Sequence, residues 1–207
     1  MTLVVASASP RRHELLATLG LRFEVAPADI DEAAAAGTRP PAEAVLAVAI
    51  AKAAAVPRVD ALVLAADTIV VVDGGVLGKP GSPAHARRML SLLRDRTHHV
   101  FTAVCLVAPD ERRTAVVESE VRMRAYRHEE IDAYVEAGGG LDKAGAYGIQ
   151  DEPLNPVESI SGCWCNVMGL PLWTTWNMLR AAGLESPRRP DEPLARCAAC
   201  PLKGEQR

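Results

Sequence analysis

The chain has 207 residues, 49% of them hydrophobic and 24% charged, with a formal net charge of −3. This length is enough for one substantial core and favours one two-lobed domain, and the slightly negative charge gives no general attraction to nucleic acid. No apolar run approaches the roughly 20 residues that span a bilayer, and no signal-peptide pattern opens the sequence, so we expect a cytoplasmic protein without a membrane partner.

An apolar run over residues 3–6 is followed by a helix-starting motif. Ser9 suits the N-cap and Pro10 the first helical position, which predicts a strand leading into a helix. Arg11 and Arg12 then occupy the first turn, where free N–H groups and the helix dipole make each cation unfavourable by about 0.3–1 kcal/mol. A bound phosphate would offset this unfavourable charge, and surface ion pairs with nearby glutamates are the less favoured alternative.

The next elements bring an acidic segment and a lysine. A short strand over 23–25 leads to an acidic loop over 29–32, and an alanine-rich helix is expected over 42–55. Lys52 falls on or beside the apolar face of that helix. A lysine there can extend its amine to solvent along the apolar surface or serve a site, and the pattern favours neither reading.

Asp67 closes the apolar run of residues 61–66, which reads as a strand, and residues 69–72 continue that run toward a turn at 73–75. A carboxylate in such surroundings needs a partner, so we favour a functional role over that of a turn former. Ligands lie at the ends of strands in open α/β sheets, which would let Asp67 and Arg11 share one cleft.

The remaining pattern completes a mixed α/β domain. The expected elements are a helix over 83–94, a strand over 99–107, a half-exposed strand around 117–124, a helix over 128–136, a loop over 141–150 and a last helix with Trp173 and Trp176. We assign residues 1–183 to the folded domain. Residues 184–207, rich in proline and charge, are expected to form a loosely ordered tail.

Five cysteines, an odd number, argue against a secreted disulfide framework. The tail motif Cys197-x-x-Cys200 is a weak metal signal by itself, because a zinc site normally needs four ligands. Cys163 and Cys165 would complete such a set if the tail folded back. A disordered tail with two free thiols is the favoured expectation.

The groups that could do chemistry combine both charges. The cations are Arg11, Arg12, Lys52, Lys79 and Lys143, and the carboxylates are Glu32, Asp67 and Asp142. Cations hold phosphate oxygens, while carboxylates hold a divalent metal that polarises a phosphoryl group. This combination predicts a phosphate-containing substrate.

Taken in order, these motifs resemble the Maf family of nucleoside triphosphate pyrophosphatases over nearly the whole chain, to about Gly183. The matching elements are Ala6-Ser7-x-Ser9-Pro10-Arg11-Arg12, Asp31-Glu32, Lys52-Ala53, Ala66-Asp67-Thr68, Gly78-Lys79-Pro80, Asp142-Lys143-Ala144-Gly145-Ala146-Tyr147-Gly148-Ile149-Gln150 and Val167-x-Gly169-Leu170-Pro171. Each element is weak alone, but the ordered set is specific.

The resemblance implies a twisted mixed sheet flanked by helices, similar to the inosine triphosphate pyrophosphatases, with two lobes around a cleft. It implies hydrolysis of a nucleoside triphosphate to the monophosphate and pyrophosphate, with Mg²⁺ or Mn²⁺. Asp67 would activate water and share the metal with Glu32. Phosphate binding would fall to Ser7, Arg12, Lys52 and Lys79.

Three further positions, Arg11, Thr68 and Gln150, look like those of the family branch that acts on dTTP and UTP. A branch similar to 7-methyl-GTP pyrophosphatases carries Trp, Gln and Glu there. An amide such as Gln150 matches the N–H donor and carbonyl acceptors of a uracil-type base, whereas a glutamate supplies acceptors only. The branch therefore predicts dTTP and UTP as preferred substrates.

House-cleaning of non-standard nucleotides is one role that this activity would serve, and a homodimer is left open. The alternative function is a nucleotide-sensing regulator of cell division or septum formation that needs no catalysis. Binding alone needs cations more than a water-activating carboxylate. The presence of Asp67 and Glu32 therefore favours the enzyme.

Overall fold

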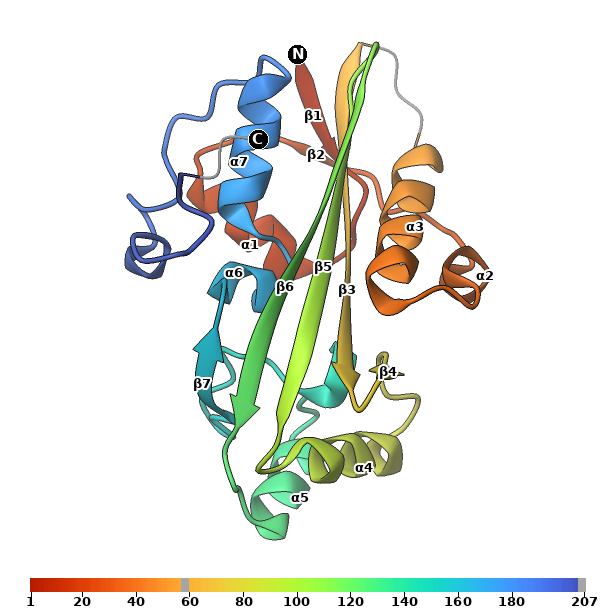
Figure 1. Cartoon of the computed structure of the whole chain (residues 1–207), viewed down its shortest axis with the longest axis vertical. Coiled ribbons are helices and arrows are strands. Elements are labelled where there is room, and N and C mark those ends of the chain that lie inside the picture. Colours follow the sequence, from red (N-terminus) through yellow and green to blue (C-terminus); the bar gives the residue numbers. More distant parts are fainter. Residues whose placement is uncertain (57–59, 205–207) are drawn as a thin grey trace.

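The computed structural model describes residues 1–56 and 60–204, whose strands form one mixed sheet (Figure 1). The strand order is β2-β1-β3-β5-β6-β7, with β4 paired to β3. The strands are β1 (Thr2–Val5), β2 (Glu24–Val25), β3 (Ala61–Val72), β4 (Gly75–Leu77), β5 (Thr97–Val107), β6 (Arg112–Met123) and β7 (Val157–Ser161). β1 runs parallel to β2 and β3, and the other pairs are antiparallel.

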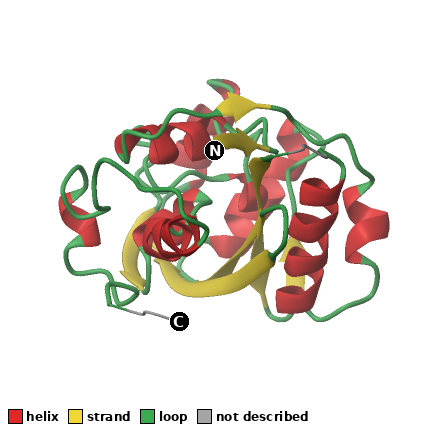
Figure 2. Ribbon diagram, turned by 90° about the horizontal axis from the view of Figure 1, so that it is seen from above, coloured by secondary structure: helices red, strands yellow, loops and turns green. Residues whose placement is uncertain are grey.

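Helices lie on both sides of this curved sheet (Figure 2), as the predicted mixed α/β class requires. They are α1 (Pro10–Thr18), α2 (Glu32–Ala36), α3 (Pro41–Ala54), α4 (Pro83–Leu93), α5 (His128–Glu136), α6 (Trp164–Met168) and α7 (Leu172–Ala181), with short 3₁₀ helices η1 (Ala144–Ala146) and η2 (Ala195–Cys197). In the described residues, no helix has the length and apolar content needed to cross a membrane.

Three long strands, β3, β5 and β6, run through both lobes of the molecule (Figure 1). In the upper lobe α3 packs on one face of the sheet, while α1 and α7 cover the other. In the lower lobe α4 and α5 pack around the far ends of the strands. A single sheet therefore holds both lobes, and the space between them opens along its middle.

The position of Asp67 corrects our expectation that it closes a strand. β3 is continuous over twelve residues, so Asp67 and Thr68 lie inside it and face opposite sides of the sheet. β1 pairs only with the first part of β3, and its last paired residue, Val5, is opposite Leu64. The loop after β1 therefore leaves the sheet beside the middle of β3, where Asp67 lies.

The alternating pattern of β6 is confirmed, because Val117, Ser119, Val121 and Met123 are all buried. The structure also adds elements that the sequence did not reveal. α2 replaces the end of the expected acidic loop, because the Asp31 side chain accepts a hydrogen bond of 2.9 Å from the N–H of Ala34 and caps a short helix. β7 and α6 follow the loop over 141–150.

The described part of the segment expected to be a loose tail, residues 184–204, packs on the domain. The N–H of Arg188 donates to the carbonyl of Leu19 at 3.2 Å, and Cys197 and Cys200 are buried in the upper core. Residues 205–207, also assigned to the tail, lie outside the described residues. The division of the chain at residue 183 stays a prediction.

Candidate active site

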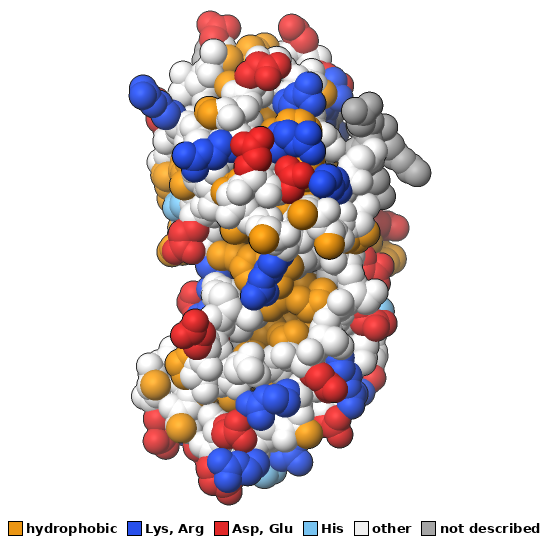
Figure 3. All heavy atoms as spheres, turned by 90° about the vertical axis from the view of Figure 1, so that its left-hand side faces the viewer, with side chains coloured by type: hydrophobic (Ala, Val, Ile, Leu, Met, Phe, Trp, Pro, Cys, Tyr) orange, Lys and Arg blue, Asp and Glu red, His pale blue; other side chains and the backbone are white. Residues whose placement is uncertain are grey.

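A cavity of about 380 Å³ lies between the lobes and brings the predicted site together. The residues predicted for catalysis, metal, phosphate or base recognition all line it: Ser7, Arg11, Arg12, Glu32, Lys52, Asp67, Thr68, Lys79 and Gln150. On the face shown in Figure 3, the surface between the lobes is hollowed and hydrophobic side chains line the hollow. The cavity lining also includes apolar side chains, among them Ile69, Val70 and Met168, so the cavity offers both ionic groups and apolar surface.

Lys52 lies between two carboxylates. From α3, its Nζ is 2.7 Å from Oδ1 of Asp67 on β3 and 2.7 Å from Oε1 of Glu32 at the start of α2. Lys52 and Asp67 are both buried, whereas Glu32 is more than half exposed. The snorkelling alternative for Lys52 is therefore wrong, because its amine is held inside by ion pairs.

The pKa of Glu32 reflects this arrangement. Partial burial acts to raise its pKa, but the hydrogen bond and charge of Lys52 outweigh it and hold the pKa below the ordinary value. Lys79 and Arg12 contribute in the same direction. Glu32 is consequently a carboxylate that stays ionised and faces cations, which suits it to bind a positive ion.

Arg12, in contrast, is hydrogen-bonded to neutral groups. Its Nη1 donates to Ser7 Oγ at 3.1 Å, its Nη2 to Thr68 Oγ1 at 3.0 Å and its Nε to the carbonyl of Gly169 at 2.8 Å. Burial lowers the pKa of Arg12, with the charge of Asp67 opposing. An anion in the cavity would stabilise this partly desolvated cation, as the unfavourable position of the arginine in α1 predicts.

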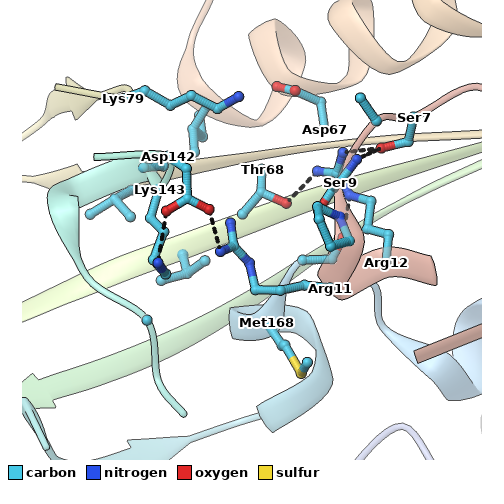
Figure 4. A pocket seen from close by; sticks show the side chains of 18 of the residues that line it. Ser7, Ser9, Arg11, Arg12, Asp67, Thr68, Lys79, Asp142, Lys143 and Met168 are labelled. Atoms are coloured by element: carbon cyan, nitrogen blue, oxygen red, sulfur yellow. Dashed lines mark hydrogen bonds and ion pairs between the residues drawn. The ribbon is translucent and has the colours of Figure 1, made fainter. Parts of the chain in front are cut away.

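Arg11 points to the opposite wall of the cavity (Figure 4). Its Nη1 lies 3.0 Å from Oδ2 of Asp142, whose Oδ1 also accepts from Lys143 Nζ at 2.7 Å. Asp142 and Lys143 were singled out by charge but received no role from the sequence. Their contact with Arg11 joins the first turn of α1 to the loop over 141–150.

Gln150 and Asp151 have different surroundings although they are adjacent. Gln150 lines the cavity and is exposed. Asp151 accepts a hydrogen bond from the Tyr134 hydroxyl on α5 and lies 3.7 Å from Lys143. The amide is therefore available to a ligand, while the neighbouring carboxylate holds the loop.

A glycine positions the wall that carries Lys79. The N–H of Gly145 donates to the carbonyl of Gly78 at 3.1 Å, which ties the loop over 141–150 to the segment after β4. Gly145 has φ of +70°, and a Cβ there would lie 3.1 Å from Val70, so another residue would be strained. In Figure 4 the ends of Lys79 and Asp67 turn toward one another.

The described residues contain no group of three or more His, Cys, Asp or Glu side chains already arranged to hold a metal ion. Glu32 and Asp67 nevertheless converge on one cation, the Lys52 amine. Mg²⁺ is often held by only one or two carboxylates, with substrate phosphates and water completing its shell. The donor set present therefore fits a metal that arrives with a triphosphate.

Comparison with known proteins identifies the family. The Maf-like protein family matches residues 2–182. The chain belongs to this family. It is 48% identical to the dTTP/UTP pyrophosphatase of Thermomicrobium roseum over 98% of this chain and 94% of that protein, and 51% identical to that of Anaeromyxobacter dehalogenans (strain 2CP-1) over 89% and 96%. Among solved structures, the Staphylococcus aureus Ham1 protein matches 60% of this chain and 73% of its own, with 18% identity and a TM-score of 0.42.

Proposed function

We propose that this Maf-like protein hydrolyses dTTP and UTP to the nucleoside monophosphate and pyrophosphate. The observation that carries the proposal is the cavity that combines the Lys52, Asp67 and Glu32 cluster with cations on the facing walls. The names and high coverage of the relatives from Thermomicrobium and Anaeromyxobacter support the same reaction.

The triphosphate would lie along the cations, with Arg12 and Lys79 on opposite sides of the cavity. Ser7 contributes through its hydroxyl group. Its oxygen already accepts from Arg12 Nη1 and from the N–H of Ser9, so its own hydrogen can be donated to a phosphate oxygen. The loop between β1 and α1 thus adds an O–H donor to the positive charge of Arg12.

A divalent ion held by Glu32 and Asp67 would neutralise developing charge on the phosphates. Lys52 helps to hold the pKa of Glu32 below its ordinary value and fixes the orientation of Asp67 by holding Oδ1. The second oxygen, Oδ2, can then accept a proton from the water that attacks the α-phosphorus. Attack there breaks the bond to the bridging oxygen between the α and β phosphates, and pyrophosphate leaves.

Base recognition would fall to the other end of the cavity, where Gln150 offers an amide donor and acceptor. Arg11, fixed by Asp142, forms the adjoining wall. Thr68 has a less direct position, because its hydroxyl accepts from Arg12 and contacts Thr102 Oγ1 at 3.0 Å. We infer that Thr68 affects the substrate by placing Arg12.

Pyrophosphate release from dTTP and UTP with Mg²⁺ or Mn²⁺ tests the proposal. Asp67→Asn preserves shape but removes the proton acceptor, so we expect kcat to fall by about 10²–10⁴-fold while nucleotide binding is retained. Glu111→Gln, an exposed change outside the cavity, is the matched control. No turnover of any nucleotide with either metal would overturn the enzyme and favour the nucleotide-sensing regulator.

Three narrower predictions accompany this function. Hydrolysis of non-standard pyrimidine triphosphates would use the same site. The rate of pyrophosphate release from modified dUTP analogues measures this activity. A cytoplasmic location agrees with five unpaired cysteines, and the homodimer remains an open option that sedimentation can decide.

A further inference from the structure

Four of the five cysteines gather at one place outside the cavity. Cys163 is the N-cap of α6 and Cys165 lies in its first turn, while Cys197 ends η2 and Cys200 follows three residues later. All four side chains are buried. Segments separated by more than thirty residues thus bring four thiols into one part of the upper core.

The sulfurs are near neighbours. Sγ of Cys165 lies 3.5 Å from Sγ of Cys197, and the Cys163 thiol interacts with the thiols of both Cys165 and Cys200. Tetrahedral zinc with Zn–S bonds of about 2.3 Å separates its sulfurs by about 3.8 Å. The distance of 3.5 Å between Cys165 and Cys197 is slightly shorter than that separation and far exceeds the roughly 2.05 Å of a disulfide.

We propose that Cys163, Cys165, Cys197 and Cys200 bind one structural zinc ion that fastens residues 184–204 to the catalytic domain. The thiols are not yet arranged around a single point. Each of the four thiols already neighbours another of the set, so side-chain rotation would bring them around one ion. Cys197-x-x-Cys200 has the spacing usual for two ligands of one structural zinc.

The surroundings suit such a site. The N–H of Asn166 lies 3.4 Å from Cys163 Sγ and donates to it, an outer contact that stabilises negative sulfur. The Arg196 guanidinium lies 4.9 Å from the centre of the Trp164 ring, so residues next to the cysteines on the two segments also contact one another.

The proposed zinc site would also stabilise the wall of the cavity through α6. This helix starts beside Cys163, and its C-cap is Gly169, whose carbonyl accepts from Arg12 Nε. Trp173 Nε1 donates to the carbonyl of Cys197 at 2.9 Å and joins α7 to the same cluster. The proposed zinc site is independent of the proposed reaction, since its evidence is the thiols alone.

Metal analysis of the full chain, purified without chelators under reducing conditions, tests the proposal. We expect close to one zinc per chain, with the four thiols protected from a thiol reagent until zinc is removed. Zinc removal should also lower the thermal midpoint. Absence of zinc with all thiols reactive, iron in place of zinc, or disulfides found by mass would each overturn it.

Cysteine variants give a matched comparison. Cys165→Ser and Cys197→Ser should reduce bound zinc to background, whereas Cys105→Ser should retain it, because Cys105 lies on β5 in a different hydrophobic cluster. If the Cys165→Ser and Cys197→Ser variants fail to fold, the wild-type chain refolded with Co²⁺ tests the site instead. A sulfur-to-cobalt charge-transfer band supports the site, and its absence overturns it.

Discussion

The Nζ of Lys52 lies 2.7 Å from Oδ1 of Asp67, and both side chains are about nine-tenths buried. α3 and β3 therefore present opposite charges to one another beneath the cavity. Removal of one partner from a buried ion pair leaves the other charge desolvated without compensation. The pair is consequently a stability element as well as part of the proposed catalytic machinery.

Lys52→Met should lower the free energy of unfolding by about 3–5 kcal/mol, because Asp67 remains buried without its cation. Urea denaturation measures this change. Lys79→Met is the matched control, since Lys79 is exposed, and it should weaken nucleotide binding with little change in stability. The Lys52→Met, Asp67→Asn double variant should regain part of the loss, and full additivity of the two changes would contradict the pairing argument.

The two arginines of α1 should have separable effects. Arg12→Met removes the cation that contacts Ser7 and Thr68, so KM should rise about equally for dTTP, UTP and CTP. Arg11→Met breaks the partly exposed pair with Asp142, which contributes only about 0–1 kcal/mol to stability, and should change the ratio of kcat/KM among the nucleotides. If both variants changed kcat/KM equally for all three nucleotides, Arg11 and Arg12 would not have separate roles.

The sequence predicted much of this site because charge and spacing are local properties. Arg11 and Arg12 at a helix start, and Asp67 between apolar runs, are unfavourable without partners. Such unfavourable placements of charge can be recognised from the sequence alone. The contact of Arg11 with Asp142 was not readable, since it depends on how the loop over 141–150 folds back across the cavity. Family resemblance, not periodicity, supplied the role of Gln150.

The helix α6 and the packing of the tail were missed for the same reason: they depend on contacts between distant segments. α6 has only five residues, too few for a periodic pattern, and it is fixed by Asn166, whose Nδ2 donates to the Val100 carbonyl and to Ser119 Oγ. The packing of the tail was not predicted because proline and charge favour disorder locally. Cys197 and Cys200 override that tendency by entering a core built from distant segments.

Gln150→Glu should lower kcat/KM for dTTP and UTP by about 10–100-fold. The glutamate cannot donate to a carbonyl of the base, and a polar group of the substrate is then left without a partner. Steady-state kinetics with both nucleotides checks this result. Asp151→Asn is the neighbouring control: it disturbs the contact with Tyr134 and should reduce stability while preserving base preference. Unchanged kcat/KM for both nucleotides in Gln150→Glu would place base recognition elsewhere.

His98 predicts a pH dependence of stability that is separate from catalysis. It is fully buried, its Nε2 lies 2.7 Å from the Tyr147 hydroxyl, and burial lowers its pKa to about 4 from 6.5. In the unfolded chain His98 becomes protonated below about pH 6.5, whereas in the folded chain it becomes protonated only near pH 4. Stability is therefore full above pH 6.5 and falls by roughly 3 kcal/mol as the pH drops through this window.

Urea midpoints measured from pH 7 to pH 4 in wild type and in His98→Gln check this linkage. The variant has no group that titrates at this position, so its stability should decline less steeply with acid than that of wild type. His128→Gln, at the exposed start of α5, should keep the wild-type slope. A His98→Gln slope equal to that of wild type would show that other groups, carboxylates among them, cause the acid sensitivity in this range.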